Sequence, residues 1–265
     1  MTTDLDVLPI ERPRRLRLEW LGPLFWKPRT TLARIQELGY ATWITPLLVV
    51  TLLAVAAILV AGPIRQAASA AAPQTPPQDF QYWAPEQQKA YMQSMAAASG
   101  TTVVYVLPAM GELLKIWIGW FLLGAILHLV LTLAGSRGNM TSALNLVAWA
   151  GLPAALRYIV QIGGMLVAHQ VIAHPGLSGF APQAGSAVMR YLGAVLPFID
   201  LYLVWGIALL LVGLIPSAGI PAGKAWVGVL ISVALLLLLK ALPGFIGASL
   251  GSLGGGGGFF PMGVG

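Results

Sequence analysis

The sequence predicts an all-α fold: a polytopic transmembrane helical bundle of five spans, with kinked third and fourth helices. Hydrophobic residues make up 57% of the 265 residues and charged residues only 9%, whereas roughly a quarter of the residues of a globular protein are charged. Uncharged apolar stretches recur at the length of about 20 residues that a helix needs to cross the hydrocarbon layer. The 31 Gly and 19 Pro suit membrane helices, which pack closely at small residues and tolerate kinks.

Five apolar regions carry the predicted spans. They are residues 42–61, 116–134 with a start as early as 103, 142–171, a stretch that ends near 215, and 225–242. Pro153 interrupts the third region, which is too short for two spans and therefore forms one kinked helix or one span with a re-entrant piece. Pro197 and Asp200 interrupt the fourth.

The spans divide the chain into three parts. Residues 1–41 form a cytoplasmic amphipathic segment, residues 42–242 a five-helix domain, and residues 243–265 a glycine-rich external tail. The first two spans are joined by an external loop over residues 62–102, in which residues 85–98 can form one more helix.

Positive charge predicts the orientation. The net charge of +6 is concentrated ahead of the first span, as expected of a cytoplasmic flank that faces anionic lipid rather than of a nucleic-acid-binding surface. Arg137 and Lys224 fall in the short loops that this choice makes cytoplasmic. We therefore expect a cytoplasmic N-terminus and an external C-terminus.

The segment Pro28–Leu38 reads as a short amphipathic helix at the cytoplasmic leaflet, with Leu32 and Ile35 on its apolar face. The aromatic residues before it are Trp20, Phe25 and Trp26. Two interpretations stay open: an anchor that sets the height of the first span, and a docking surface for a partner.

Four charged residues in or near the spans are candidate site residues, because a charge at the centre of a membrane helix costs at least ~2.5 kcal/mol. Glu112 and Lys115 are three positions apart and can pair on one helix face. Arg157 and Asp200 lie on different helices, and neither has a partner on its own helix, so we expect a cross-bundle ion pair. Such a pair can fix helix register, or it can line a proton or ion pathway.

Motifs for chemistry are missing from the sequence. It has no cysteine, no phosphate-binding loop, and three histidines without metal-ligand spacing. Ser178 lies in a GLSG string like that of intramembrane serine proteases, but all three histidines precede it, whereas such a serine takes its base from a later helix. We expect no catalytic residue, metal, cofactor, small-molecule substrate or nucleic acid.

Three stretches carry a resemblance to a known family. They are FWKPRTTLARI, LLGAILHLVLTLAGSRGNMTSALNLVAWAGLP and FIDLYLVWGIALLLVGL, which resemble the Yip (Ypt-interacting protein) domain family of five-span membrane proteins. In eukaryotes the resemblance implies Golgi and endoplasmic reticulum proteins with small GTPases as partners. In bacteria it implies accessory subunits beside the permease of ABC exporters. The compact loops of this chain favour the bacterial type, for which we expect a location in the plasma membrane.

The leading hypothesis is a noncatalytic accessory or scaffold subunit of a membrane complex, surrounded by membrane lipid and associated with an ABC exporter permease. Gly206 and Gly213 on the fourth span would let a partner helix approach closely. A small transporter or channel that uses Arg157 and Asp200 is the alternative, and an intramembrane enzyme is the weakest hypothesis.

The orientation gives a first testable prediction. A reporter fused after Gly265 should report an external location, because the fifth span reverses the side on which the chain started. A fusion in the loop at Arg137 is the matched control and should report a cytoplasmic location. A cytoplasmic signal from the Gly265 fusion would contradict the five-span topology.

Overall fold

The computed structural model describes residues 16–71, 76–172, 174–181 and 186–254, and every regular element in these ranges is a helix. The elements are η1 (Leu18–Trp20), α1 (Leu21–Trp26), α2 (Pro28–Glu37), α3 (Ile44–Ala71), η2 (Phe80–Tyr82), α4 (Pro85–Ala98), the π-helical η3 (Thr102–Val106), α5 (Leu107–Leu133), α6 (Met140–Ala150), α7 (Pro153–Ala168), η4 (Ser178–Phe180), α8 (Ala187–Val195), η5 (Leu196–Phe198), α9 (Leu201–Ser217) and α10 (Ala222–Gly254). The all-α fold class predicted from the sequence is confirmed.

Within the described ranges, four helical units are long and apolar enough to cross a membrane. They are Ile44–Ala71, Thr102–Leu133, Met140–Ala168 and Ala222–Gly247. The pair Ala187–Phe198 and Leu201–Ser217 passes the same test together but bends by 74° at its break, so it is either a broken fifth span or a re-entrant loop. The third unit is itself broken between α6 and α7, where Pro153 begins the second half.

Two helices extend beyond the bounds expected from the sequence. Helix α3 continues through Pro63 to Ala71, so residues 62–71 are helical instead of opening the external loop. Helix α10 continues through Pro243 to Gly254, so residues 243–254 are helical as well, and only the rest of the predicted tail lies outside the described residues. A proline removes one backbone hydrogen bond without obliging the helix to end, and the alanine-rich run after Pro63 favours helix.

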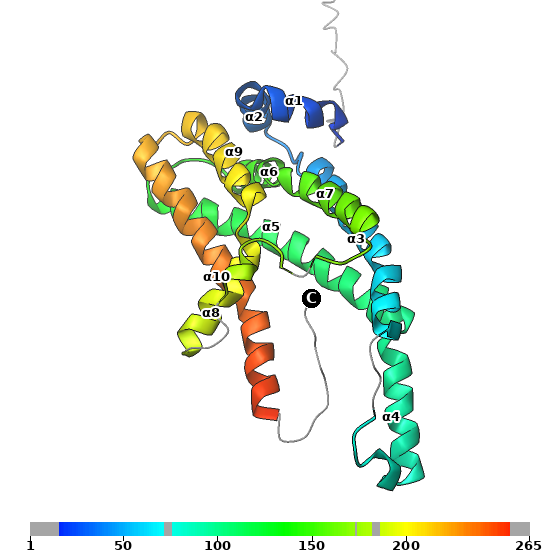
Figure 1. Ribbon diagram of the computed structural model, residues 1–265. Helices are drawn as coiled ribbons and strands as arrows, with labels where there is room; N and C mark the ends of the chain where they lie inside the picture. The colour runs from blue at the N-terminus through cyan, green and yellow to red at the C-terminus, as the bar shows by residue number, and fades with distance from the viewer. Residues whose placement is uncertain (1–15, 72–75, 173, 182–185, 255–265) are drawn as a thin grey trace, which may run out of the picture.

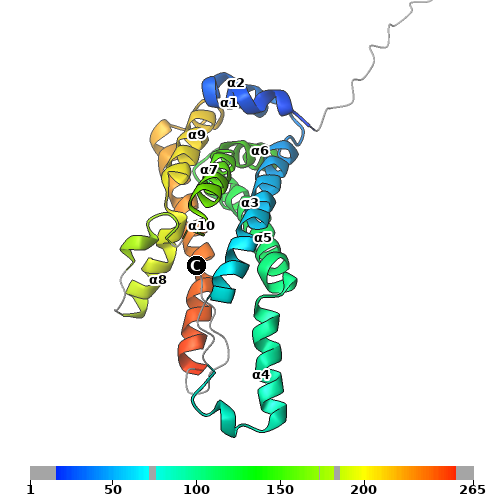
Figure 2. The same cartoon turned by 45° about the vertical axis from the view of Figure 1, so that its right-hand side comes forward.

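The bundle carries extra helices at both ends. Figures 1 and 2 show α1 and α2 lying across one end of the bundle, while α4 extends from the opposite end. Helix α8 packs beside α10. The transmembrane helices between these ends include a strongly tilted α5 that crosses α3, α6 and α10 (Figure 1).

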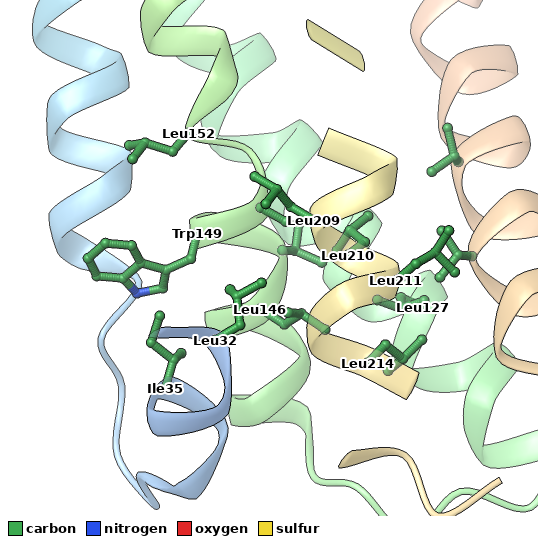
Figure 3. Packing of buried hydrophobic residues seen from close by; sticks show 14 of the residues in the cluster. Leu32, Ile35, Leu127, Leu146, Trp149, Leu152, Leu209, Leu210, Leu211 and Leu214 are labelled. Atoms are coloured by element: carbon green, nitrogen blue, oxygen red, sulfur yellow. The ribbon is translucent and has the colours of Figure 1, made fainter. Parts of the chain in front are cut away.

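The apolar face of α2 is covered by the bundle itself. Leu32 and Ile35 are both 0% exposed, and Figure 3 shows them beside Leu146 and Trp149 of α6. A Cβ added to Gly213 of α9 would lie 2.5 Å from Leu146 Cδ1 and 3.2 Å from Leu32 Cβ. The missing side chain at Gly213 therefore lets α2 and α6 both approach α9.

A buried polar network fixes the connection between α2 and α3. Asn145 of α6 is 0% exposed; its Oδ1 accepts a hydrogen bond from the Thr42 backbone N–H at 2.8 Å, and its Nδ2 donates to the Tyr40 carbonyl at 2.9 Å. Trp149 Nε1 donates to Thr42 Oγ1 at 3.1 Å. One asparagine thus satisfies the buried backbone N–H of Thr42 and the partly buried carbonyl of Tyr40.

Replacing Asn145 tests this network. Asn145→Ala should lower the free energy of unfolding by about 1–3 kcal/mol, because the Thr42 N–H and the Tyr40 carbonyl lose their partners. The measurement is equilibrium unfolding of the detergent-solubilised chain in SDS. Asn139→Ser is the matched control, since serine can still cap α6 as Asn139 does. Equal stability of the Asn145→Ala variant and the native chain would contradict the role of the network.

Candidate functional site: the intramembrane charged cluster

Asp200 lies at the break between η5 and α9 and serves two partners. Its Oδ1 accepts a hydrogen bond from the Leu203 backbone N–H at 2.8 Å, which caps the start of α9. Its Oδ2 lies 3.2 Å from Arg157 Nη1. The sequence expectation that Arg157 and Asp200 approach each other agrees with this geometry, and the function of the pair stays a prediction.

Arg157 is positioned by the break in the third span. Helix α7 begins at Pro153, so Arg157 lies in its first turns, near the point where α6 ends. The same region meets α9, because a Cβ added to Gly206 would lie 3.2 Å from the Ala150 carbonyl oxygen. The breaks of the third and fourth spans are therefore neighbours, and the ion pair joins them.

A second charged pair lies on α5, and a hydrogen bond from α7 reaches it. Glu112 Oε2 lies 3.2 Å from Lys115 Nζ, as the spacing of three residues predicts for one helix face. The other oxygen, Oε1, accepts a hydrogen bond from the Tyr158 hydroxyl at 2.6 Å. Tyr158 is adjacent to Arg157 in sequence, so α7 is tied to α9 through one residue and to α5 through the next.

Lys240 is a fifth charged residue of this region, and sequence reasoning missed it. It lies on α10, and its side chain crosses to α5, where a Cβ added to Gly119 would lie 2.9 Å from Cε and 3.1 Å from Nζ. The signal was a single cation directly after a run of five leucines. We use the name charged cluster for these five residues: Glu112, Lys115, Arg157, Asp200 and Lys240.

The charged cluster is only partly shielded from solvent. The side chains of Asp200 and Arg157 are 14% and 30% exposed, and that of Lys115 is 61% exposed. Chemically, the arrangement holds paired charges and one phenolic hydroxyl. In the part of the chain that the structure describes, no group of three or more His, Cys, Asp or Glu side chains could hold a metal ion.

The structure corrects the expectation that Leu32 and Ile35 bind a partner. Both side chains belong to the main hydrophobic core of the chain. The amphipathic pattern of α2 requires an apolar cover, and α6 and α9 provide it, so these residues are not available to a second protein or to lipid.

The aromatic residues before α2 divide into two kinds. Trp20 packs on Trp149 with ring centroids 5.8 Å apart, and Phe25 packs edge-on against Trp205 at 5.4 Å. Trp26 is 87% exposed. Of the three aromatic residues predicted to contact a partner, Trp26 alone presents most of its surface.

Gly206 and Gly213 were expected to line a face for a partner helix, and the structure corrects this as well. The space beside Gly213 is filled by Leu146 and Leu32, and the space beside Gly206 is closed by the Ala150 carbonyl. Small residues permit close approach in both places, as expected in lipid, but the helices that approach belong to the same chain.

The apolar helices and the charged cluster between them define a multi-pass α-helical membrane protein. A family model described as the Yip1 domain matches residues 24–242, which includes α2, the candidate spans up to residue 242 of the last one, and all five residues of the charged cluster. The chain belongs to the Yip1 domain family. A search of curated proteins and a search of solved structures each give no match.

The Arg157 and Asp200 pair gives a testable prediction. Arg157→Leu should reduce the amount of assembled protein more than the double variant Arg157→Leu, Asp200→Asn, because the single change leaves a carboxylate without its partner. The measurement is the yield of monodisperse protein after size-exclusion chromatography in mild detergent. Arg190→Leu, at an exposed position of α8, is the matched control. Equal losses in the single and double variants would show that the two charges act independently.

Proposed function

We propose that this Yip1 family protein is a noncatalytic accessory subunit of a membrane complex, and that its partner is the permease of an ABC exporter. The observation that carries the proposal is the rigid attachment of α1 and α2 to the bundle. Their inner face is buried against α6 and α9, while their outer face keeps a large exposed aromatic residue. A surface that is held rigidly loses little conformational freedom when a partner binds.

Four exposed residues of α1, α2 and the residue between them form what we call the N-terminal platform: Trp26, Lys27, Arg29 and Arg34. Tryptophan and arginine are both enriched at binding hot spots. In the predicted orientation the platform faces the cytoplasm at the plasma membrane, where both the membrane-proximal loops of a permease and anionic headgroups are within reach.

The exporter assignment rests on the family. The resemblance implies that bacterial members are accessory subunits beside the permease, and an accessory role uses binding surfaces without a catalytic residue or a cofactor. This supports a noncatalytic role for the present chain as well.

Co-purification tests the proposal. Affinity purification of the full chain in mild detergent should recover a permease and its ATPase, and Trp26→Ala should reduce that recovery several-fold, since an exposed hot-spot tryptophan contributes at least about 2 kcal/mol. Tyr82→Ala removes an aromatic side chain that is 81% exposed in the loop before α4, and it should leave recovery unchanged. Deletion of the gene should lower the level of the partner complex, while the ATPase activity of the purified partner persists.

A small transporter or channel is the second candidate, and the partial exposure of Arg157 and Asp200 favours it. The purified chain in liposomes should then move an ion or solute, and Asp200→Asn should abolish the flux. Such a flux would overturn the accessory role if the Trp26→Ala variant also recovered as much permease and ATPase as the native chain.

A further inference from the structure

Lys240 carries the excess charge of the charged cluster. Asp200 is paired with Arg157, and Glu112 is paired with Lys115, so both carboxylates already have a cationic partner. Within the described ranges, no carboxylate oxygen lies within 4.0 Å of Lys240 Nζ. The side chain is only partly exposed and belongs to a candidate span, where an uncompensated ammonium group is costly.

The surface of α5 has room for this ammonium group. Gly119 has no side chain at the point where Lys240 Cε and Nζ cross. Lys115 precedes Gly119 by four positions, which places it one turn away on the same face of α5. The Lys240 ammonium group therefore reaches a short stretch of α5 that also carries Lys115 and its partner Glu112, and these three residues together hold two positive charges and one negative charge. Because the Lys115 side chain is 61% exposed, a ligand can reach this stretch.

The helix lengths and the predicted orientation put the two lysines near the external boundary of the hydrocarbon layer. Lys240 follows the start of α10 at Ala222 by 18 positions, and Lys115 precedes the end of α5 at Leu133 by 18 positions. At a rise of 1.5 Å per residue each interval is about 27 Å along its helix, close to the hydrocarbon thickness of about 30 Å. In the predicted orientation this boundary belongs to the outer leaflet, at the depth where phospholipid phosphates begin.

We infer that Lys240 and Lys115 together bind a phosphate-bearing anion between α5 and α10. One phosphate monoanion would neutralise the excess positive charge, and its oxygens can accept hydrogen bonds from both ammonium groups. A phospholipid headgroup and free inorganic phosphate offer this same chemistry. The site is at the opposite side of the membrane from the N-terminal platform, so the inference does not rest on the proposed exporter partner.

The experiment follows the thermal midpoint, Tm, of the full chain in an uncharged detergent. One series adds dioctanoyl phosphatidylglycerol, a second adds inorganic phosphate, and dioctanoylglycerol serves as the control lipid without phosphate. The native chain should gain about 5–10 °C at a hundredfold excess of ligand over Kd. Lys240→Met should weaken binding at least tenfold, and Lys240→Arg should retain it.

Two further variants separate the site from general effects of charge. Lys224→Met makes the same substitution near the start of α10, and it should keep the full Tm increase. Gly119→Ala keeps every charge but displaces the Lys240 ammonium group, and it should weaken binding several-fold. Lys240→Met removes an uncompensated charge, so its ligand-free Tm should equal or exceed that of the native chain.

The outcomes are distinguishable. A Tm increase with phosphatidylglycerol alone supports the inference and identifies a lipid ligand, whereas an increase with inorganic phosphate as well supports it and identifies the free anion. No increase in either series would overturn the inference, as would an increase that Lys240→Met retains, or one that dioctanoylglycerol produces equally.

Discussion

The rest of the bundle depends on one requirement. The backbone groups freed at the break before α9 need hydrogen-bond partners away from water. A broken helix exposes backbone groups that lipid cannot hydrogen-bond. Asp200 meets part of this requirement by accepting from Leu203 N while it neutralises Arg157. On the other side of the break, Leu196 O accepts from the Leu177 backbone N–H at 3.1 Å. Gly176, at a φ of 59°, lets that loop approach within a distance that a side chain would prevent. Both sides of one break therefore have dedicated partners.

The third span joins this break to the N-terminal platform. Its first half, α6, carries Asn145, which holds the chain before α3 through neutral hydrogen bonds. Its second half, α7, carries Arg157 and Tyr158, which hold α9 and α5 through charged groups. The two polar networks differ in their environment, since the neutral one is centred on the fully buried Asn145 side chain and the ionic one is partly exposed. A displacement of the third span would disturb both.

Sequence patterns predicted which helix faces and charges need a partner better than they predicted which residues act as that partner. Prolines and apolar spacing located α2 and α4 within one residue of their observed bounds, and the cost of a buried charge predicted the approach of Arg157 and Asp200. The pattern of α2 shows an apolar face, but lipid, a partner and the same chain can all cover such a face, so the burial of Leu32 could not be read from it. Asn145 was missed because a single polar residue in an apolar stretch does not reveal which backbone groups it satisfies.

The burial of Leu32 against Gly213 also sets an order of events during synthesis. The ribosome makes Leu32 181 residues before Gly213, which at roughly 5–20 residues per second corresponds to roughly 10–35 seconds of elongation. Throughout that interval the apolar face of α2 lacks its permanent cover, and an amphipathic helix in that state rests at the membrane surface. A helix that is made early is thus covered late, and its docking marks the completion of the fourth span.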